Sequence, residues 1–341
     1  MDGRDGRDEE AYRAAELYYL QNETMESIAT RLGVSRSTVS RLLSTARAEG
    51  WVRITLGPRP GGDSELAGRL RRTHGVRAHL VPTRAGATDD QRLDQVTTAA
   101  ARLVESLVRP GSSLGMAWGS TVAAVAGRLR RTPTPGCSIV QLNGSANTTT
   151  SGIPYSESIL ATAAEAFDAE VHWFPVPAFF DYPDTKRALW RERSIAGVLT
   201  RQTECDLALF GVGSLTGPRP SHVYTSGYLD RDTMAELGAA GVVGDICTVL
   251  LRGDGSYADL AINDRASGPT PAQLRRIGRR ICVVSGRHKV PATLAALRAR
   301  VATDLVIDES TARELLRLSG PERPDRAGSP GPTRRRRARS S

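Results

Sequence analysis

Cysteine, lysine and long apolar runs are scarce in this sequence, and each scarcity narrows the class of protein. The four cysteines, Cys137, Cys205, Cys247 and Cys282, lie far apart in apolar surroundings, with no CxxC pair and no histidine pair nearby. This spacing predicts no metal site, and we expect no cofactor. Buried free thiols in a reducing compartment are expected, with two disulfides as the alternative.

No segment approaches the run of about 18 apolar residues that a membrane-spanning helix needs. The first ten residues, MDGRDGRDEE, are charged and lack the apolar core of a signal peptide. We therefore expect a soluble cytoplasmic protein without a membrane partner.

The positive charge comes almost entirely from arginine, because only Lys186 and Lys289 among the 46 basic residues are lysines. The net charge of +9 and the pI near 9.9 favour an anionic partner. However, the tail after Leu318 has seven arginines against two acidic residues and supplies about five of these charges. The folded part is only mildly basic. The run Arg334–Arg337 could add nonspecific attraction to DNA or could simply be a solvated tail.

Residues 24–46, TMESIATRLGVSRSTVSRLLSTA, have the spacing of a helix-turn-helix. Gly33 stands where the tight turn needs a positive φ, and Ser35 is placed to cap the second helix. A further helix is predicted over Glu10–Gln21. The residues predicted to form the buried faces of the two motif helices are Ile28, Ala29, Leu32, Val39, Leu42 and Leu43. An ordinary helical hairpin with a polar face is the alternative.

The polar face of the second motif helix combines short hydroxyls with guanidinium groups. Hydroxyls reach phosphates or base edges, and arginine pairs with guanine or phosphate, so this helix is predicted to read the major groove. The predicted DNA-binding residues are Ser35, Arg36, Ser37, Thr38, Ser40 and Arg41. A short strand is predicted over Gly50–Leu56, in which Trp51 is expected to pack beside the recognition helix, with base stacking as the alternative.

Beyond residue 62, strand-like runs alternate with helical ones. The predicted strands are Ala78–Pro82, Ser113–Met116, Ser138–Leu142, Glu170–Pro175, Asp206–Val212, Asp245–Leu251, Ile281–Val284 and Asp304–Ile307. The predicted helices are 91–108, 120–131, 156–168, 185–202, 290–300 and Glu309–Leu318. This alternation predicts an α/β domain with a largely parallel sheet covered by helices on both faces.

Composition divides the chain into five parts, because the glycine- and proline-rich GPRPGG separates the helical region from the alternating one. Polar segments with too few apolar residues to form a core flank both regions. The predicted parts are a disordered leader 1–9, a DNA-binding domain 10–56, a linker 57–62, a large domain 63–318 and a disordered basic tail 319–341.

Three loops follow predicted strands, where open α/β sheets place their ligands. The loop 114–121 ends in Gly119, Ser120 and Thr121 directly before a helix, and this pattern suits a phosphate group. Ser120 or Thr121 as a plain helix cap is the alternative.

The second loop, 209–215, contains Gly211 and Gly213, which would let backbone N–H groups approach a ligand, or which form an unremarkable glycine turn. The third, 284–289, ends in Lys289, whose compact ammonium suits a phosphate or carboxylate. A solvated surface lysine is the alternative.

Polar residues near other predicted strand ends are weaker candidates. Gln141 and Asn143 could hydrogen-bond sugar hydroxyls, although an Asn-Gly turn explains Asn143 as well. Asp245 could accept from a hydroxyl or cap local backbone. The histidines show no zinc-ligand spacing.

Taken together, these motifs resemble the SorC family of bacterial transcriptional regulators, also called sugar-binding or central glycolytic regulators. The resemblance covers roughly residues 10–318 and rests on AELYYLQNETMESIATRLGVSRSTVSRLL, GMAWGST, VQLNGS, DLALFGVGSL and VGDIC. It implies a Rossmann-like effector domain similar to ribose-5-phosphate isomerase and glucosamine-6-phosphate deaminase. In those enzymes a G-S-T loop, matching Gly119–Thr121, holds the sugar phosphate. The deaminases also place a phosphate-binding lysine in an SGxxK segment, matching Ser285–Lys289.

One departure from the deaminases concerns catalysis. Their G-x-G-x-D-G-H segment supplies an aspartate and a histidine, whereas Gly211–Gly217 here contains neither. General acid–base chemistry needs such groups, so no catalytic residue is assigned and no enzymatic activity is expected. The alternatives are an isomerase or deaminase with a DNA-binding appendage, and a DNA-binding protein without an effector.

The sequence therefore predicts a regulator whose affinity for double-stranded operator DNA is modulated by a sugar or sugar phosphate bound in the large domain, 63–318. A single helix-turn-helix makes few DNA contacts, so a dimer or tetramer is expected. The large domain is expected to form the oligomer interface as well as the effector site.

Overall fold

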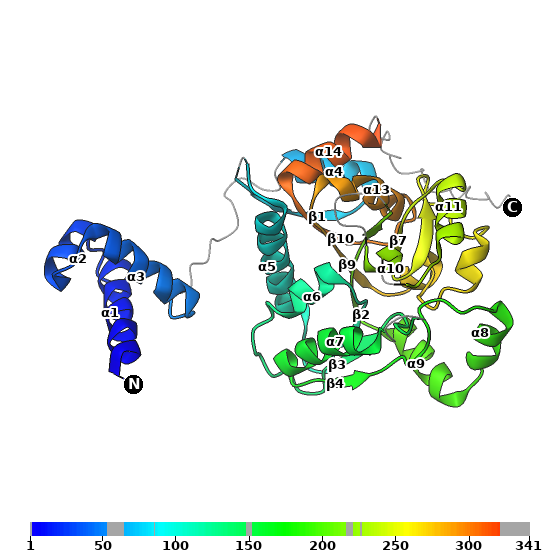
Figure 1. Ribbon diagram of the computed structural model, residues 1–341, viewed down its shortest axis with the longest axis horizontal. Coiled ribbons are helices and arrows are strands. Elements are labelled where there is room, and N and C mark those ends of the chain that lie inside the picture. Colours follow the sequence, from blue (N-terminus) through cyan, green and yellow to red (C-terminus); the bar gives the residue numbers. More distant parts are fainter. Residues whose placement is uncertain are drawn as a thin grey trace, which may run out of the picture. The chain divides into compact units, whose positions relative to one another are not determined.

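The computed structural model describes residues 2–52, 65–84, 86–147, 152–215, 221–225 and 227–320. The chain divides after Gly62 into two compact units (Figure 1). The predicted linker, most of the strand predicted over Gly50–Leu56 and nearly all of the predicted disordered tail lie outside the described residues. Within these ranges, no helix combines the length and apolar character needed to cross a membrane.

The first unit consists of three helices around a small apolar core. The helices are α1 Asp2–Tyr19, α2 Met25–Leu32 and α3 Arg36–Ala48. Ala14, Leu17, Ile28, Val39 and Leu43 are almost completely buried between them. The partly buried members of the predicted faces are Ala29, Leu32 and Leu42. The predicted helix-turn-helix stripes therefore do form the core.

The first helix begins eight residues earlier than predicted. Residues 2–9, predicted as part of a disordered leader, are helical, because α1 begins at Asp2. The leader contains no proline that would stop a helix. A helical segment without an apolar face gives no periodic signal, so the sequence pattern could not show this extension.

The turn between α2 and α3 has the predicted geometry. Gly33 has a φ of +67°, and the Val34 N–H donates to the Ala29 carbonyl at 3.0 Å. The Ser35 hydroxyl caps α3 by accepting from the Thr38 N–H at 3.2 Å. Glycine and serine at these two positions thus fix the angle between the helices.

The second unit is built on a seven-stranded sheet with the order β1-β10-β9-β5-β2-β3-β4 among the described residues. The strands are β1 Arg77–Val81, β2 Ser113–Met116, β3 Ser138–Gln141, β4 Glu170–His172, β5 Leu207–Gly211, β9 Arg279–Val284 and β10 Asp304–Asp308. Every neighbouring pair is parallel. The predicted parallel α/β architecture is confirmed.

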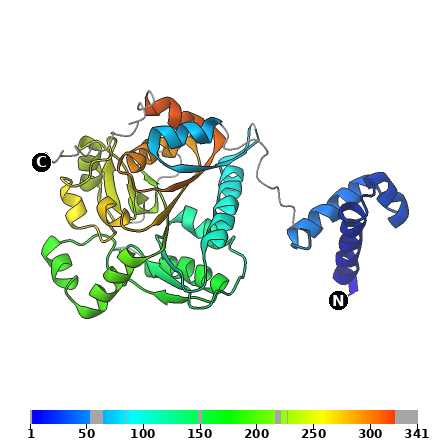
Figure 2. The ribbon, with the colours of Figure 1, turned by 180° about the vertical axis from the view of Figure 1, so that it is seen from behind.

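Helices cover both faces of this sheet, as Figure 2 shows from behind. One face packs against α5 Asp89–Leu107, α6 Ser120–Ala126 and α7 Ile153–Phe167. The other packs against α4 Glu65–His74, α13 Val290–Arg298 and α14 Glu309–Ser319. The remaining helices are α8 Pro183–Leu189, α9 Arg193–Glu204, α10 His222–Thr225, α11 Arg231–Ala239, α12 Pro271–Leu274 and the short 3-10 turns η1 Ala261–Asp264 and η2 Arg287–Lys289.

Three features of the second unit differ from the prediction. The strand predicted over Asp245–Leu251 is an antiparallel hairpin of β7 Val242–Ile246 and β8 Val249–Arg252, which joins β6 Gly213–Ser214 in a separate small sheet. Its turn residues, cysteine and threonine, give no turn signal. The helix predicted over 185–202 is two helices, α8 and α9, and α4 was not predicted. All four cysteines are free and buried, as predicted.

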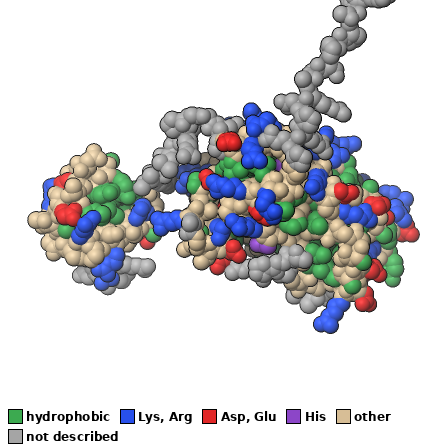
Figure 3. Space-filling view, turned by 90° about the horizontal axis from the view of Figure 1, so that it is seen from above, with side chains coloured by type: hydrophobic (Ala, Val, Ile, Leu, Met, Phe, Trp, Pro, Cys, Tyr) green, Lys and Arg blue, Asp and Glu red, His purple; other side chains and the backbone are tan. Residues whose placement is uncertain are grey.

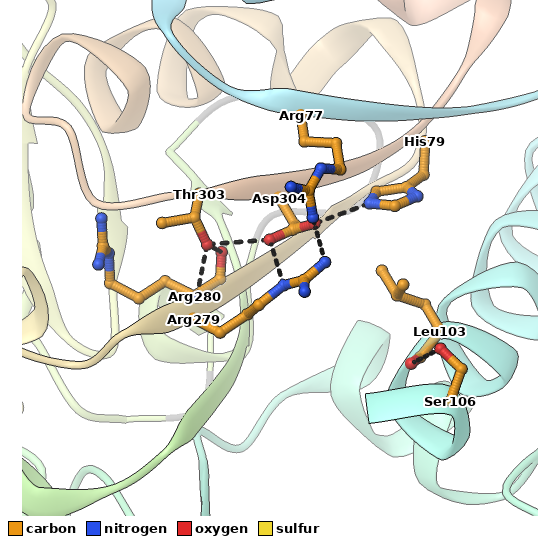
Figure 4. A network of polar contacts seen from close by, with 8 residues as sticks. All are labelled: Arg77, His79, Leu103, Ser106, Arg279, Arg280, Thr303 and Asp304. Atoms are coloured by element: carbon orange, nitrogen blue, oxygen red, sulfur yellow. Dashed lines mark hydrogen bonds and ion pairs between the residues drawn. The ribbon is translucent and has the colours of Figure 1, made fainter. Parts of the chain in front are cut away.

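A polar cluster at the amino ends of the strands ties the edge strand β1 to β10 and β9. Figure 4 shows Arg77 and His79 of β1 and Arg279 of β9 converging on the Asp304 carboxylate. His79 Nε2 lies 2.8 Å from Asp304 Oδ1, and the Arg279 guanidinium donates to both carboxylate oxygens at 2.9 Å. Burial alone would raise the pKa of Asp304, but the hydrogen bonds from His79, Arg279 and Thr303 hold it well below its usual range.

Replacing Asp304 with asparagine is expected to destabilise the second unit by about 2 kcal/mol at pH 7. This is less than for a fully buried pair, because His79 and Arg279 are partly exposed. Since the folded-state pKa is depressed, the carboxylate stabilises fully above the ordinary aspartate pKa of about 4 and loses this effect as the pH falls further. Urea unfolding at a series of pH values from 7 down to 2 should show a gap between wild type and Asp304→Asn that stays constant to about pH 4 and narrows steadily below it. A gap of the same size at pH 7 and at pH 2 would show that the charge contributes nothing.

Candidate functional site

The exposed face of α3 has the composition expected of a DNA-reading helix. Arg36, Ser37, Ser40 and Arg41 are exposed, and Thr38 is half-buried. The Ser35 hydroxyl lies 2.8 Å from the Ser37 hydroxyl and 2.9 Å from that of Thr38. The predicted residues therefore lie together along the N-terminal half of one helix face, the part that a recognition helix inserts into the groove.

The two arginines of this face are held differently. Arg36 forms an ion pair of 3.1 Å with Glu26 of α2, which directs its guanidinium toward the neighbouring helix. Arg41 is exposed and makes a long hydrogen bond of 3.4 Å to the Thr38 hydroxyl. Arg41 is thus the better placed of the two for a base edge.

Trp51 lies at the end of the first unit and is 40 % exposed. Its ring makes an edge contact with Tyr12 of α1, with the centroids 6.0 Å apart. It packs on α1, and its backbone N–H donates to the Ala46 carbonyl at the end of α3. This contact with Tyr12 agrees with the packing role predicted for Trp51.

A cavity of about 150 Å³ opens at the carboxyl ends of β2, β3, β5 and β9. We call it the strand-end cavity. Loops after these strands, the β7–β8 turn, η2 and the start of α10 form its walls. Eight of the nine residues predicted to bind a ligand line it: Gly119, Ser120, Thr121, Asn143, Gly211, Gly213, Asp245 and Lys289. Loops separated by up to 170 residues in sequence thus form one site.

Gln141 is the predicted residue that the structure does not bring to this cavity. Its side-chain amide donates to the Asn143 carbonyl and accepts from the Phe174 N–H, each at 2.9 Å. The side chain is buried and holds the loop that carries Asn143. Gln141 therefore stabilises the loop that carries Asn143 and does not itself line the cavity.

Asn143 is buried, and its side-chain oxygen has no hydrogen-bond partner among the described residues. A buried acceptor without a donor costs free energy, and such groups are rare unless a ligand or water satisfies them. Because Asn143 lines the strand-end cavity, its oxygen is available to a hydroxyl donor there.

Three polar side chains form the centre of the cavity. Lys289 Nζ donates to the Thr121 hydroxyl at 3.1 Å, which joins η2 to the start of α6. Asp245 accepts from the Tyr224 hydroxyl at 2.8 Å and from the Thr248 N–H at 3.1 Å. A cation and an anion therefore line one cavity without a direct ion pair between them.

Burial changes the acidity of these groups. Burial raises the pKa of Asp245 to about 6, although hydrogen bonds from Tyr224 and Thr248 and the charge of Lys289 oppose the change. Burial lowers the pKa of Lys289, while Cys282 and Asp245 oppose that change. Asp245 therefore loses its negative charge as the pH falls through about 6.

Glycine is required at 213 but not at 211. A Cβ on Gly213 would lie 1.8 Å from Asp245 Oδ1, whereas one on Gly211 would make ordinary contacts with Val283 and Thr121. The absence of a side chain at Gly213 therefore lets its backbone lie against the Asp245 carboxylate.

The β7–β8 turn at the cavity wall adopts a costly backbone conformation. Cys247 and Thr248 have φ values of +47° and +71°, which side chains with a Cβ rarely adopt. Asp245 holds the Thr248 N–H, and Gly268 packs so closely that a Cβ there would lie 1.6 Å from the Cys247 carbonyl oxygen. Strained backbone of this kind is typical of ligand sites. Both turn residues line the cavity, and the sequence pattern did not identify them.

An aromatic wall on one side of the cavity was also missed. Trp118 and His222 line the cavity, and Tyr228 stacks on Trp118 with the ring centroids 5.3 Å apart. Tyr155 lies 4.8 Å from His222, and burial lowers the pKa of this imidazole. The signal that could have identified Trp118 is its position directly before Gly119. Aromatic faces beside polar groups suit a carbohydrate ring.

Comparisons with known proteins match both units. Residues 59–317 match the family described as "Putative sugar-binding domain". Residues 15–49 match region 4 of sigma-70, a range that includes the end of α1 and all of α2 and α3.

Two regulators illustrate the likeness along the whole chain. The deoxyribonucleoside regulator of Bacillus subtilis is 32% identical over 309 residues, which are 89% of this chain and 96% of that protein. The sorbitol operon regulator of Klebsiella pneumoniae is 27% identical over 89% of this chain and 96% of its own length.

Solved structures have the same architecture. A domain of a possible sugar-binding transcriptional regulator from Arthrobacter aurescens has a TM-score of 0.69 at 42% identity, covering 76% of this chain and 100% of that one. The full-length sorbitol operon regulator from Klebsiella pneumoniae has a TM-score of 0.66 at 26% identity, covering 91% and 99%.

Proposed function

Because the chain belongs to the SorC family of sugar-binding transcriptional regulators, we propose that a sugar phosphate in the strand-end cavity controls the affinity of α3 for operator DNA. The observation that carries the proposal is the cavity itself, in which Lys289, Thr121, Asp245 and the unpaired oxygen of Asn143 converge. These groups offer a cation for a phosphate and acceptors for hydroxyls.

Each group has a separate role in this proposal. Lys289 and the Thr121 hydroxyl bind the phosphate, together with backbone of the loop Gly119–Ser120. Asn143 and Asp245 accept hydrogen bonds from sugar hydroxyls, and Trp118 packs against the ring. A neutral, unphosphorylated sugar would lack the charge-assisted hydrogen bonds between a phosphate and the Lys289 ammonium and should bind more weakly.

The proposed DNA contacts come from the exposed face of α3. Ser35 caps this helix and is proposed to face the DNA backbone as well. The predicted contact residues are Ser35, Arg36, Ser37, Thr38, Ser40 and Arg41. One such helix covers about one half-site, so we propose that the protein acts as a homo-oligomer. The effector would change DNA affinity by binding one arrangement of subunits better than another.

Binding without turnover is also part of the proposal. Gly211–Gly217 lacks the aspartate and histidine that the related deaminases use. The relatives named above are regulators. An enzyme with a DNA-binding appendage is the competing function.

A thermal-shift screen of the full chain against sugar phosphates and the matching free sugars tests the proposal. A sugar phosphate that binds should raise the melting temperature increasingly as its concentration exceeds its Kd, and the free sugar should do so less. The hit is then added to a gel shift on DNA that the protein selects from a random library. No stabilisation by any sugar phosphate would favour a regulator without an effector, and release of a chemically altered sugar would favour the enzyme.

A further inference from the structure

A second and larger cavity, of about 600 Å³, adjoins the strand-end cavity. It lies between the loop after β1, the start of α5, η2 and the start of α14. Four arginines line it: Arg84, Arg92, Arg287 and Arg313. We call it the arginine groove. Seen from above, basic side chains gather over much of the surface of the second unit (Figure 3).

The groove and the strand-end cavity share part of their walls. Asp89 and His288 line both cavities. His288 directly precedes Lys289, the cation of the strand-end cavity. A ligand that contacts η2 in the groove therefore contacts the same short turn that positions Lys289.

Two of the arginines are fixed by neighbours in the groove wall. The Arg92 guanidinium donates to the Ser310 hydroxyl at 3.1 Å and also to the Ala87 carbonyl. Its Nε is buried, lies 3.8 Å from the Asp89 carboxylate and has no hydrogen-bond partner within the described ranges. Arg313 forms an ion pair of 2.9 Å with Glu309.

The other two arginines leave the groove with excess positive charge. Arg84 and Arg287 are exposed and form no ion pair within the part of the chain that the structure describes. The four guanidinium groups face two lining carboxylates, those of Asp89 and Glu309. The buried carboxylate of Asp308 accepts hydrogen bonds from Gly286, Ser310 and Thr311 and adds a third negative charge beside the groove. Glu314, which also lies near Arg287, is paired with Arg317. Four guanidinium groups against these three carboxylates leave an excess of positive charge.

We propose that the arginine groove is a second phosphate-binding site, separate from the site of the effector, for inorganic phosphate or the phosphate of a monoester. Guanidinium groups bind phosphate oxygens in a planar, paired geometry, and several around one cavity favour a doubly charged anion. Because the two cavities share η2, phosphate in the groove alters the position of Lys289 and so tunes the response to the effector.

The test is calorimetric titration of the full chain with inorganic phosphate, and in parallel with methyl phosphate, at low ionic strength. Lys289→Met is the background, so that the strand-end cavity does not contribute. Binding is expected to persist in this background and to weaken at least tenfold when Arg84→Ala and Arg287→Ala are added. Arg201→Ala on α9, an exposed arginine outside both cavities, is the matched control and should leave binding unchanged.

The comparison of methyl phosphate with inorganic phosphate shows whether the groove binds a phosphate monoester or only free phosphate. Equal affinity for both probes indicates that the groove accepts a monoester, and loss with methyl phosphate restricts it to free phosphate. The proposal is overturned if the Lys289→Met protein binds neither probe, or if Arg201→Ala weakens binding as much as the groove pair does. Neither result contradicts the proposed effector site, because that site is tested separately by the Lys289 substitution with sugar phosphates as ligands.

Discussion

Replacing Lys289 with methionine is expected to weaken the binding of a sugar phosphate by about 10- to 100-fold. Lys289 is a partly buried cation that lines the strand-end cavity, and its ammonium donates to the Thr121 hydroxyl. Methionine keeps an unbranched apolar chain of similar length but cannot donate to phosphate. A charge-assisted hydrogen bond is worth roughly 1.5–3 kcal/mol, which corresponds to this range of affinities.

The same substitution also affects Asp245. The charge of Lys289 lowers the pKa of Asp245, whereas burial raises it to about 6. Without the ammonium, Asp245 should take up its proton at a higher pH. The pH at which sugar-phosphate affinity changes is therefore expected to move upward from about 6 in Lys289→Met.

The chain offers a matched control, because its other lysine lies elsewhere. Lys186 packs 5.6 Å from the centre of the Trp190 ring, on α8, and lies outside the strand-end cavity. Lys186→Met removes the same charge and should leave sugar-phosphate affinity within about twofold. Titration calorimetry measures the affinity of both variants for the sugar phosphate identified in the thermal-shift screen. Equal losses in both would mean that net charge, and not the position of Lys289, controls binding.

The sequence pattern could indicate this cavity because open parallel sheets bind their ligands at the carboxyl ends of the strands. Loops ending in Thr121, Gly213 and Lys289 could be assigned to strand ends from the alternation of apolar runs and turns alone. Once those strands pair in parallel, their loops must meet, however far apart they are in sequence. This part of the prediction needed only the order of elements.

Side-chain direction could not be predicted in the same way. Gln141 ends β3 and Asn143 lies two residues further on in the following loop, yet Asn143 lines the cavity whereas Gln141 hydrogen-bonds backbone away from it. The choice depends on the backbone groups that the β3–β4 connection and the segment after β4 present, and periodicity does not contain that information.

The residues of the β7–β8 turn explain why the sequence predicted one strand where the structure has a hairpin. The run GDICTVLL reads as one buried strand, because its turn residues Cys247 and Thr248 are not those that favour positive φ. Instead, the Asp245 carboxylate accepts from the Thr248 N–H across the turn, and Gly268, twenty residues further on, packs against the Cys247 carbonyl. The hairpin, and the cavity wall it forms, therefore follow from tertiary packing.

At the other end of the protein, Arg41→Ala is expected to lower affinity for the selected operator by about 10- to 100-fold and to relax sequence preference at one base pair. Arg41 is exposed on the hydroxyl-rich face of α3, and one long hydrogen bond to Thr38 holds it loosely. It can exchange this bond for a guanine edge at little cost. Arg36, which is paired with Glu26, should contribute less to specificity.

The matched control is Arg13→Ala, an exposed arginine on α1 of the same unit. It removes the same charge away from the recognition helix, so it should lower binding to selected and random DNA alike and by less than about threefold. Full-length proteins are compared in gel shifts on the operator selected by wild type and on random DNA of equal length. If Arg41→Ala weakens both DNAs equally, Arg41 contacts a phosphate and reads no base. If it weakens neither, α3 does not use this side chain, and base reading falls to the other proposed contacts, Ser35, Arg36, Ser37, Thr38 and Ser40.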